Sequence, residues 1–302
     1  MHVVFRESHG LEETETPTDL AQTPAELVVL SLSDSDLGAF AAGWHRAGGG
    51  LPSLRLANIA ALKHPLSVDT YVEQTLGEAK GILIRLIGGV PYWSYGLQRV
   101  EALAQEMGIA LAVLSADGRP DAQLDAISTL PTSTLRRLSH HCDTGGAVAA
   151  QAALAQLSLA AGLYAGPVQG AKTMPMVGAW TPEHGVCCPL ILPISDKPLA
   201  LITFYRAYLT SADLGPVEAL SAALRERGFD VLGFFAPSLK APGVSGWLSR
   251  QIRHLKPSAI VNATSFSGKD DSGSSPLDAG DVPIHGDYDA DAHALVEQAA
   301  AD

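Results

Sequence analysis

Short apolar runs alternate with longer amphipathic stretches over the first 115 residues of the chain. Runs rich in Val, Ile and Leu are typical of buried strands, whereas apolar residues that recur every three or four positions predict helices. Strands are predicted at 2–5, 26–32, 53–59, 81–87 and 109–115, with helices at 36–48, 67–79 and 95–108. Because apolar strands that alternate with helices form parallel sheets covered on both faces, residues 1–130 are predicted to form an α/β domain of Rossmann-like or flavodoxin-like type.

The same alternation returns after a different middle section. Residues 131–198, helical at first and then rich in Pro and Gly, are predicted to be a helical and loop connector. A second α/β unit is predicted at 199–270, followed at 271–302 by a polar linker and a short C-terminal helix. The elements of this second unit are predicted as strands at 199–205, 229–236 and 258–264 and helices at 211–228 and 244–257. The predicted fold is therefore two parallel-sheet lobes joined by a helical connector.

Composition and charge restrict the class of function. The chain has 302 residues, of which 47% are hydrophobic, and a formal net charge of −12. An excess of acidic residues argues against sequence-independent binding of nucleic acid, which requires clustered Lys and Arg. Three cysteines in so long a chain are no disulfide framework. The start of the chain does not resemble a secretory signal, and polar residues interrupt the Ala-rich stretch 147–166, so a cytoplasmic protein without a membrane segment is predicted.

Motifs for metal binding, nucleotide binding and nucleophilic catalysis are weak or absent. Residues 184–188 hold one His and two Cys but lack the second ligand pair of a structural zinc site. Residues 139–143 hold two His and one Cys in a row, and consecutive side chains on a helix point in different directions. The sequence contains no phosphate-binding glycine loop and no G-x-S-x-G. No metal site is predicted, and no catalytic residue can be assigned.

Arginines and aromatic residues near predicted strand ends are the candidate binding residues. In open α/β sheets, ligands bind outside the carboxyl ends of the strands. A guanidinium group matches carboxylates, and aromatic faces suit a flat macrocycle. The alternative for each arginine is an ion pair with Asp or Glu, or a side chain that reaches the surface. The candidate substrate-binding residues are Arg55, Arg85, Tyr92, Trp93, Tyr205 and Arg206.

Several long sequence segments, taken together, resemble one protein family. Residues 52–75, 84–104 and 200–240, extended by 257–267, resemble the large subunit of the aerobic, ATP-dependent cobaltochelatase, CobN. This family is similar to the porphyrin-binding H subunit of magnesium chelatase. Its members are several times longer than this chain, so the resemblance implies an N-terminal portion.

The resemblance implies a function that the residues alone do not. Family members insert cobalt into hydrogenobyrinic acid a,c-diamide during cobalamin synthesis. The large subunit holds the corrin, and two partner subunits form an AAA+ motor that hydrolyses ATP. On this basis cobalt and ATP are expected to serve the full complex and not to be bound by this part, which would contact the corrin or the motor subunits without catalysing alone. A non-catalytic scaffold or regulatory module, and a magnesium chelatase H-type portion, are the alternatives.

Overall fold

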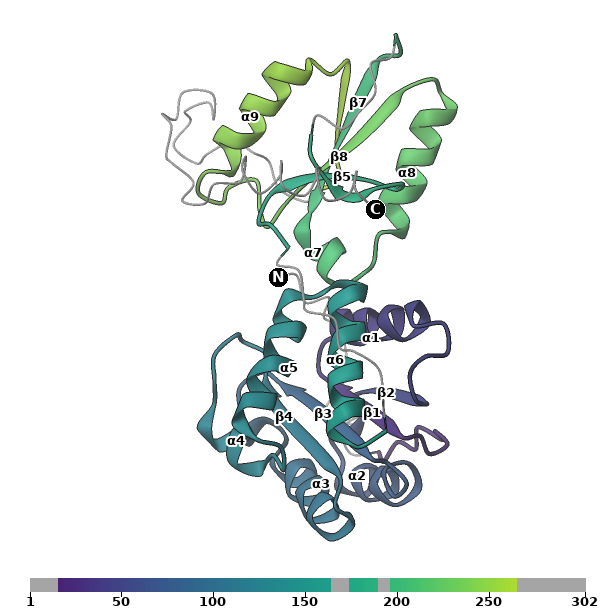
Figure 1. The fold of residues 1–302 in the computed structure, drawn as a ribbon, viewed down its shortest axis with the longest axis vertical. Coiled ribbons are helices and arrows are strands. Elements are labelled where there is room, and N and C mark those ends of the chain that lie inside the picture. The colour runs from purple at the N-terminus through teal and green to yellow at the C-terminus, as the bar shows by residue number, and fades with distance from the viewer. Residues whose placement is uncertain (1–15, 164–173, 190–195, 265–302) are drawn as a thin grey trace. The chain divides into compact units, whose positions relative to one another are not determined.

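The computed structural model describes residues 16–163, 174–189 and 196–264, and they form two compact units (Figure 1). Unit 1 comprises Met1–Thr173 with Thr210–Ala212, and unit 2 comprises Met174–Leu209 with Asp213–Asp302. The predicted strand at 2–5 and the predicted helix in the C-terminal segment lie outside the described residues. Each unit is treated by itself below.

Unit 1 is built on a four-stranded parallel sheet, sheet A, with the strand order β2-β1-β3-β4. Every residue of β1 and of β3 is buried, as the continuous apolar runs predict for strands covered on both faces. The parallel α/β fold predicted for this region is therefore confirmed. The strands are β1 (Leu27–Ser31), β2 (Leu54–Asn58), β3 (Gly81–Leu86) and β4 (Ala110–Ser115).

Helices cover both faces of sheet A, as Figure 1 shows. The first face packs against α1 (Asp34–Arg46), α5 (Thr132–Thr144) and α6 (Gly146–Ala160). The second packs against η2 (Ile59–Leu62), α2 (Pro65–Tyr71), η3 (Val72–Leu76), η4 (Val90–Trp93), α3 (Ser94–Met107) and α4 (Ala122–Ile127). Because β1 connects to β2 over one face while the next two connections run over the other, unit 1 is doubly wound.

The structure assigns α5 and α6 to unit 1, although the sequence pattern places them in a connector. Helix α6 is Ala-rich and apolar on nearly every side, and such a helix is stable only when it is buried. It packs closely on α1, where a Cβ atom added to Gly43 would lie 2.6 Å from the backbone nitrogen of Gln151. Sheet A, α1 and α5 together supply the burial that α6 requires.

Unit 2 contains a five-stranded mixed sheet, sheet B, with the order β6-β5-β8-β7-β9. Strands β8, β7 and β9 are parallel, as predicted, and β5 and β6 add an antiparallel hairpin inside the segment predicted to be loop. Helices α7 and α8 pack against one hydrophobic cluster of side chains from sheet B, and α9 packs against a second cluster from the same sheet. The strands are β5 (Gly178–Thr181), β6 (Gly185–Cys187), β7 (Leu199–Tyr205), β8 (Asp230–Ala236) and β9 (Ala259–Asn262), and the helices are α7 (Arg206–Thr210), α8 (Gly215–Glu226) and α9 (Val244–Leu255).

Candidate functional site

Both sheets contain a point where the order of the strands reverses. In sheet A the chain passes from β1 to β2 on one side, and β3 lies on the other side of β1. In sheet B the chain passes from β7 to β8, and β9 lies on the other side of β7. Open α/β sheets bind ligands at the carboxyl ends of the strands beside such a reversal. We therefore name two candidate sites: edge A, at the carboxyl ends of sheet A, and edge B, at the carboxyl ends of sheet B.

Arg85 lies at edge A but keeps its charge inside the protein. It is the penultimate residue of β3 and is only 5% exposed. Its Nη1 donates to Oδ1 of Asp36 at 2.9 Å, and its Nη2 donates to Oδ1 of Asp143 at 2.9 Å. Its Nε is buried and has no hydrogen-bond partner among the described residues. For Arg85 the sequence leaves an ion pair with Asp or Glu open as the alternative to ligand binding. The structure shows such ion pairs, and they join β3 to α1 and α5.

Local structure fixes the carboxylate that Arg85 meets on α1. Ser33 is the N-cap of α1, and its side chain accepts a hydrogen bond from the backbone nitrogen of Asp36. The buried Ser31 hydroxyl donates to Oδ2 of Asp36 at 2.9 Å and accepts from the backbone nitrogen of Ser33. Both oxygens of Asp36 are therefore engaged, and the guanidinium of Arg85 meets a carboxylate that is already oriented.

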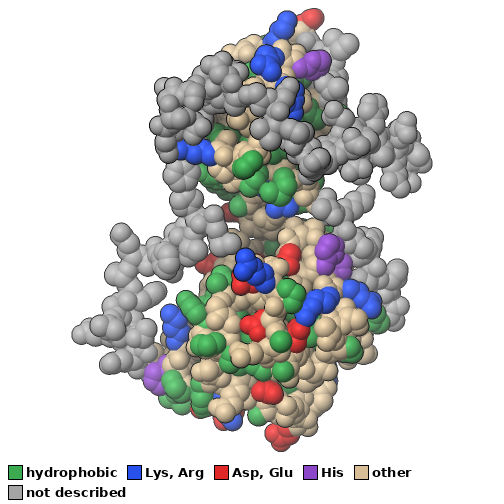
Figure 2. All heavy atoms as spheres, turned by 90° about the vertical axis from the view of Figure 1, so that its left-hand side faces the viewer, with side chains coloured by type: hydrophobic (Ala, Val, Ile, Leu, Met, Phe, Trp, Pro, Cys, Tyr) green, Lys and Arg blue, Asp and Glu red, His purple; other side chains and the backbone are tan. Residues whose placement is uncertain are grey.

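The rest of edge A carries more acidic than basic residues. The start of α1 bears Asp34 and Asp36, the loop after β4 bears Asp117, Arg119 and Asp121, and α5 adds Asp143. A hydrogen bond from Ser115, together with the backbone nitrogen of Arg119, lowers the pKa of Asp117, which favours its ionised form. On the face of unit 1 in Figure 2, acidic, basic and hydrophobic side chains are interspersed. Edge A therefore combines a neutralised arginine with several carboxylates and is poorly suited to an anionic ligand.

The Gly-Gly turn after β3 is followed by two aromatic residues with different environments. Gly88 and Gly89 have φ angles of 87° and 72°, which favour glycine. Tyr92 is 61% exposed and lies over Gly88, where an added Cβ would come within 3.0 Å of the ring. Trp93 is buried, and its Nε1 donates to the carbonyl oxygen of Leu62 at 2.8 Å. Trp93 therefore faces the core of unit 1, and only Tyr92 faces outward.

Arg55 lies away from edge A. It is the second residue of β2, so the prediction that it lies near the carboxyl end of its strand is wrong. Its Nε donates to the carbonyl oxygen of Thr23 at 2.8 Å, and its Nη1 donates to the carbonyl oxygen of Leu54 at 2.9 Å. Arg55 thus fixes the segment that precedes β1. Within sheet A, Arg55 and Arg85 therefore do not meet at edge A.

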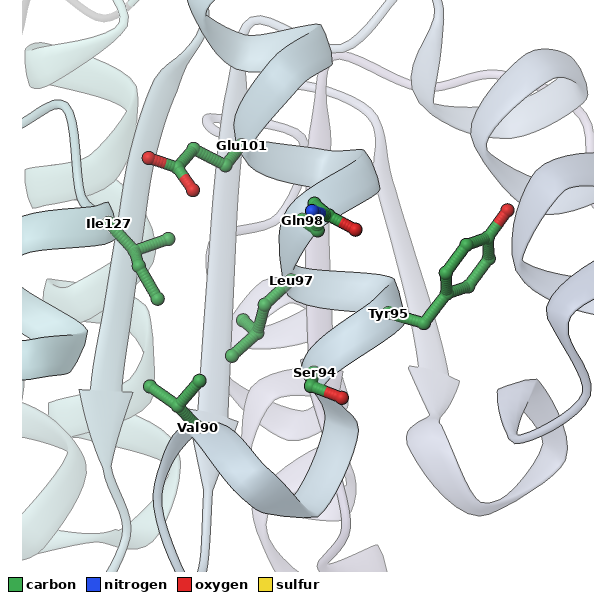
Figure 3. Close-up of a pocket in the computed structure, with 7 residues that line it drawn as sticks. All are labelled: Val90, Ser94, Tyr95, Leu97, Gln98, Glu101 and Ile127. Atoms are coloured by element: carbon green, nitrogen blue, oxygen red, sulfur yellow. The ribbon is translucent and has the colours of Figure 1, made fainter.

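An open hollow of about 400 Å³ lies beside α3 in unit 1 (Figure 3). In Figure 3 the side chains of Val90, Leu97 and Ile127 point toward one another, and Tyr95 lies on the other side of α3. The hydroxyl of Tyr95 is bonded to the carboxylate of Asp69 at 2.9 Å, which joins α3 to α2. The lining residues are Val90, Ser94, Tyr95, Leu97, Gln98, Glu101 and Ile127. Sequence reasoning missed this hollow because it did not predict α4, which contributes Ile127.

Edge B differs from edge A in its charges. Tyr205 ends β7, and Arg206 follows as the first residue of α7. Nε of Arg206 donates to the carbonyl oxygen of Pro175 at 3.0 Å, and its Nη2 donates to that of Met174 at 3.1 Å. Lys240 is exposed in the loop after β8. Residues 237–243 contain no Asp or Glu, so the loop after β8 brings no negative charge to edge B.

Polar residues also join the strands at edge B. The hydroxyl of Thr203 on β7 donates to Oδ1 of Asn262 on β9 at 2.8 Å. The same oxygen of Asn262 accepts from the backbone nitrogen of Thr264 at 3.2 Å. The bond from Thr203 crosses between β7 and β9, where the order of sheet B reverses, and it fixes the carboxyl end of β9 beside that of β7.

The cysteines and the potential metal ligands of the described residues form neither a metal site nor a reactive thiol. No group of three or more His, Cys, Asp or Glu among the described residues could hold a metal ion. Burial raises the pKa of Cys142 to about 12 and that of Cys187 to about 11. Both thiols are therefore protonated near neutral pH and are weak nucleophiles. No described helix has the length and apolar character needed to cross a bilayer.

The comparisons with known proteins agree with one another. Residues 148–285 match a family model described as CobN/Magnesium Chelatase. The aerobic cobaltochelatase subunit CobN of a Sinorhizobium species is 35% identical over 285 residues, and that of Pseudomonas aeruginosa is 33% identical over 277 residues. Each alignment covers 88% of this chain but 22% of the relative, so the chain spans about a fifth of the length of these relatives.

A solved structure shows the same fold. The catalytic subunit of cobaltochelatase from Mycobacterium tuberculosis superposes with a TM-score of 0.60 at 24% sequence identity, over 78% of this chain and 18% of that one. The fold, the family model and both curated relatives lead to the same conclusion. The chain belongs to the CobN/magnesium chelatase family.

Proposed function

We propose that this chain is part of the large subunit of an aerobic cobaltochelatase and that edge B contacts the corrin. The observation that carries the proposal is the identity of 35% and 33% to two proteins that are both named aerobic cobaltochelatase subunit CobN. Both names favour cobalt over magnesium, although the family model covers both branches. The substrate proposed for the whole subunit is hydrogenobyrinic acid a,c-diamide, with cobalt as the inserted metal.

Charge favours edge B over edge A as the anion-binding site. The corrin substrate carries several carboxylates, which bind cations and hydrogen-bond donors. Edge A holds Arg85 between two carboxylates, whereas the guanidinium of Arg206 is anchored by two neutral carbonyl oxygens. Lys240 adds a second cation, and Tyr205 adds an aromatic ring beside Arg206. Edge B also lies within the residues that match the family model.

The proposed role of this part is binding and not the insertion step. These 302 residues contain no phosphate-binding loop, and we propose that ATP is hydrolysed by other subunits. We propose that these are the AAA+ motor subunits implied by the family. The residues that transfer cobalt are proposed to lie in the part of the large subunit that this chain does not span.

Titration with the corrin tests the proposal. Hydrogenobyrinic acid a,c-diamide is added to the natural chain and to Arg206→Gln, Lys240→Gln and Arg55→Gln, and binding is followed by the shift of corrin absorbance. Arg206→Gln should weaken binding about tenfold, the size expected for one hydrogen-bonded charge, and Lys240→Gln by a few fold. Arg55→Gln is the matched control and should bind like the natural chain. Circular dichroism verifies that each variant is folded.

Three other outcomes would contradict the proposed site, the proposed macrocycle or the proposed binding role. Equal binding by all four proteins would exclude edge B as the site. Tighter binding of protoporphyrin than of the corrin would favour a magnesium chelatase H-type function. Capture of purified motor subunits by a chain that binds neither macrocycle would favour a scaffold.

A further inference from the structure

The open hollow beside α3 combines an apolar floor with a carboxylate. Val90, Leu97 and Ile127 form the floor, and in Figure 3 their side chains point toward one another. Glu101 lies one turn of α3 beyond Leu97, so the two residues share one side of the helix. In Figure 3 the carboxylate of Glu101 lies at the end of the hollow away from Val90. A group bound in the hollow would therefore contact apolar side chains along its length and a negative charge at one end.

The carboxylate of Glu101 has no cation beside it in the described part of the chain. Its side chain is half-buried, and its Oε1 accepts a hydrogen bond from Nε2 of Gln105 at 3.2 Å. Arg99 is the basic residue of α3, and its Nε donates to Oδ1 of Asp69 at 2.7 Å instead. Partial removal of a carboxylate from water is unfavourable unless a cation or a hydrogen-bond donor compensates it. The hollow is therefore complementary to a group that has an apolar stem and a positive end.

We propose that the hollow beside α3 binds an arginine side chain presented by a partner protein. The aliphatic stem of arginine suits the apolar floor, and its guanidinium group binds a carboxylate through two parallel hydrogen bonds. Its further N–H groups can reach the side-chain oxygens of Ser94 and Gln98, which line the same hollow. Arginine fits this arrangement better than lysine, because an ammonium group is a point charge without a planar fork of donors.

The openness of the hollow favours a side chain from a protein surface over a free small molecule. Sites for small ligands enclose most of the ligand, whereas Ser94 and Gln98 on the rim of the hollow are exposed to solvent. Arginine is enriched in protein interfaces and among the residues that contribute most to their affinity. Tyr95, which also lines the hollow, is 39% exposed and gives the neighbours of the arginine an aromatic surface to contact. All these residues belong to unit 1, so the inference is independent of edge B in unit 2.

Titration of the natural chain with short peptides, followed by nuclear magnetic resonance, tests the inference. The probe is the capped peptide Leu-Arg-Leu, and its matched control contains citrulline, which keeps the shape of arginine without the charge. Signals of Val90 and Ile127 report on the hollow, and those of Val186 and Ile260, exposed apolar residues of unit 2, are internal controls. We expect Leu-Arg-Leu to shift the signals of the hollow with a Kd of about 1 mM. The citrulline peptide should bind about fivefold more weakly, which is the ratio that one exposed ion pair supports.

Two variants of α3 separate the ion pair from other causes of binding. Glu101→Gln should weaken binding of Leu-Arg-Leu about fivefold and leave the affinity for the citrulline peptide unchanged, because only the charged pair is lost. Glu106→Gln removes an exposed glutamate of α3 that does not line the hollow, and it should bind both peptides like the natural chain. Circular dichroism verifies that both variants are folded.

Four results would overturn the inference. The first is equal affinity of the natural chain for the two peptides, and the second is an unchanged affinity for Leu-Arg-Leu in Glu101→Gln. The third is the absence of shifts at Val90 and Ile127 with the peptide at about 10 mM, tenfold above the expected Kd. The fourth is binding of free pentylguanidinium as tightly as the peptide, since the hollow would then serve a small molecule and not a partner protein.

Discussion

Replacing Arg85 by Met should destabilise unit 1 far more than replacing an exposed arginine. Removal of one partner of a buried ion pair costs about 3 to 5 kcal/mol, because the remaining charge is left uncompensated. Here Asp36 and Asp143 are 20% and 37% exposed at their side chains, so water can reach both carboxylates. We therefore expect a loss of about 2 to 3 kcal/mol in the free energy of unfolding. The matched control is Arg136→Met, whose pair with Asp125 is more exposed and should cost less than about 1 kcal/mol.

Hydrogen exchange of the strands measures this loss in unit 1 without interference from unit 2. Amides of β1 and β3 should exchange about 30- to 150-fold faster in Arg85→Met than in the natural chain, since each 1.4 kcal/mol is about tenfold. Adding Asp36→Asn and Asp143→Asn to Arg85→Met should slow exchange again, because the uncompensated carboxylates are gone. If Arg85→Met and Arg136→Met exchanged alike, Arg85 would not be a structural ion pair and the reasoning would be refuted.

Two further predictions concern a turn and a surface ion pair. Gly89 has φ 72° and ψ −163°, and an added Cβ would lie 3.2 Å from Oδ2 of Asp121, so Gly89→Ala should cost about 2 to 3 kcal/mol in urea denaturation. Gly108→Ala, left-handed but with open space around it, should cost only about 1 kcal/mol, and equal losses would contradict the argument. The hydrogen bond from Arg225 lowers the pKa of Glu183 from 4.5 to about 2, so its stabilisation is present above pH 4.5 and is lost as the pH falls toward 2. Glu183 is half-exposed, so Glu183→Gln should reduce stability by less than about 1 kcal/mol at neutral pH and show a smaller loss on acidification in thermal melts.

The sequence predicts the parallel strands of both sheets well because their signal is local. The run at 81–87 contains six consecutive positions that are buried in β3, it begins at Gly81, and Gly88 follows its end. Gly108 adopts the left-handed conformation and ends α3, as its position after the amphipathic stretch predicts. Strand β7 occupies 199–205, the range predicted from its apolar run. Patterns within one segment are sufficient for such elements.

The partners of individual side chains could not be predicted, because they come from distant segments. Asp36 lies 49 residues from Arg85, and Asp143 lies 58 residues from it. The hairpin of β5 and β6 escaped prediction because strands of four and three residues are too short to show a period. Trp93 and Tyr92 are adjacent and alike in sequence, yet only the packing of η4 on Leu62 decides which one is buried.

The two edges show that topology and charge answer different questions about a binding site. Both sheets place an arginine at the carboxyl edge beside a reversal of strand order, so topology alone ranks Arg85 and Arg206 equally. Their observed acceptors differ, because Arg85 donates to the carboxylates of Asp36 and Asp143, whereas Arg206 donates to the carbonyl oxygens of Met174 and Pro175. A cation held by carbonyls can still attract an anion, and one held by two carboxylates belongs to a site that is net negative. The position of an arginine therefore locates a candidate site, and the charge of its hydrogen-bond acceptors determines whether an anionic macrocycle can bind there.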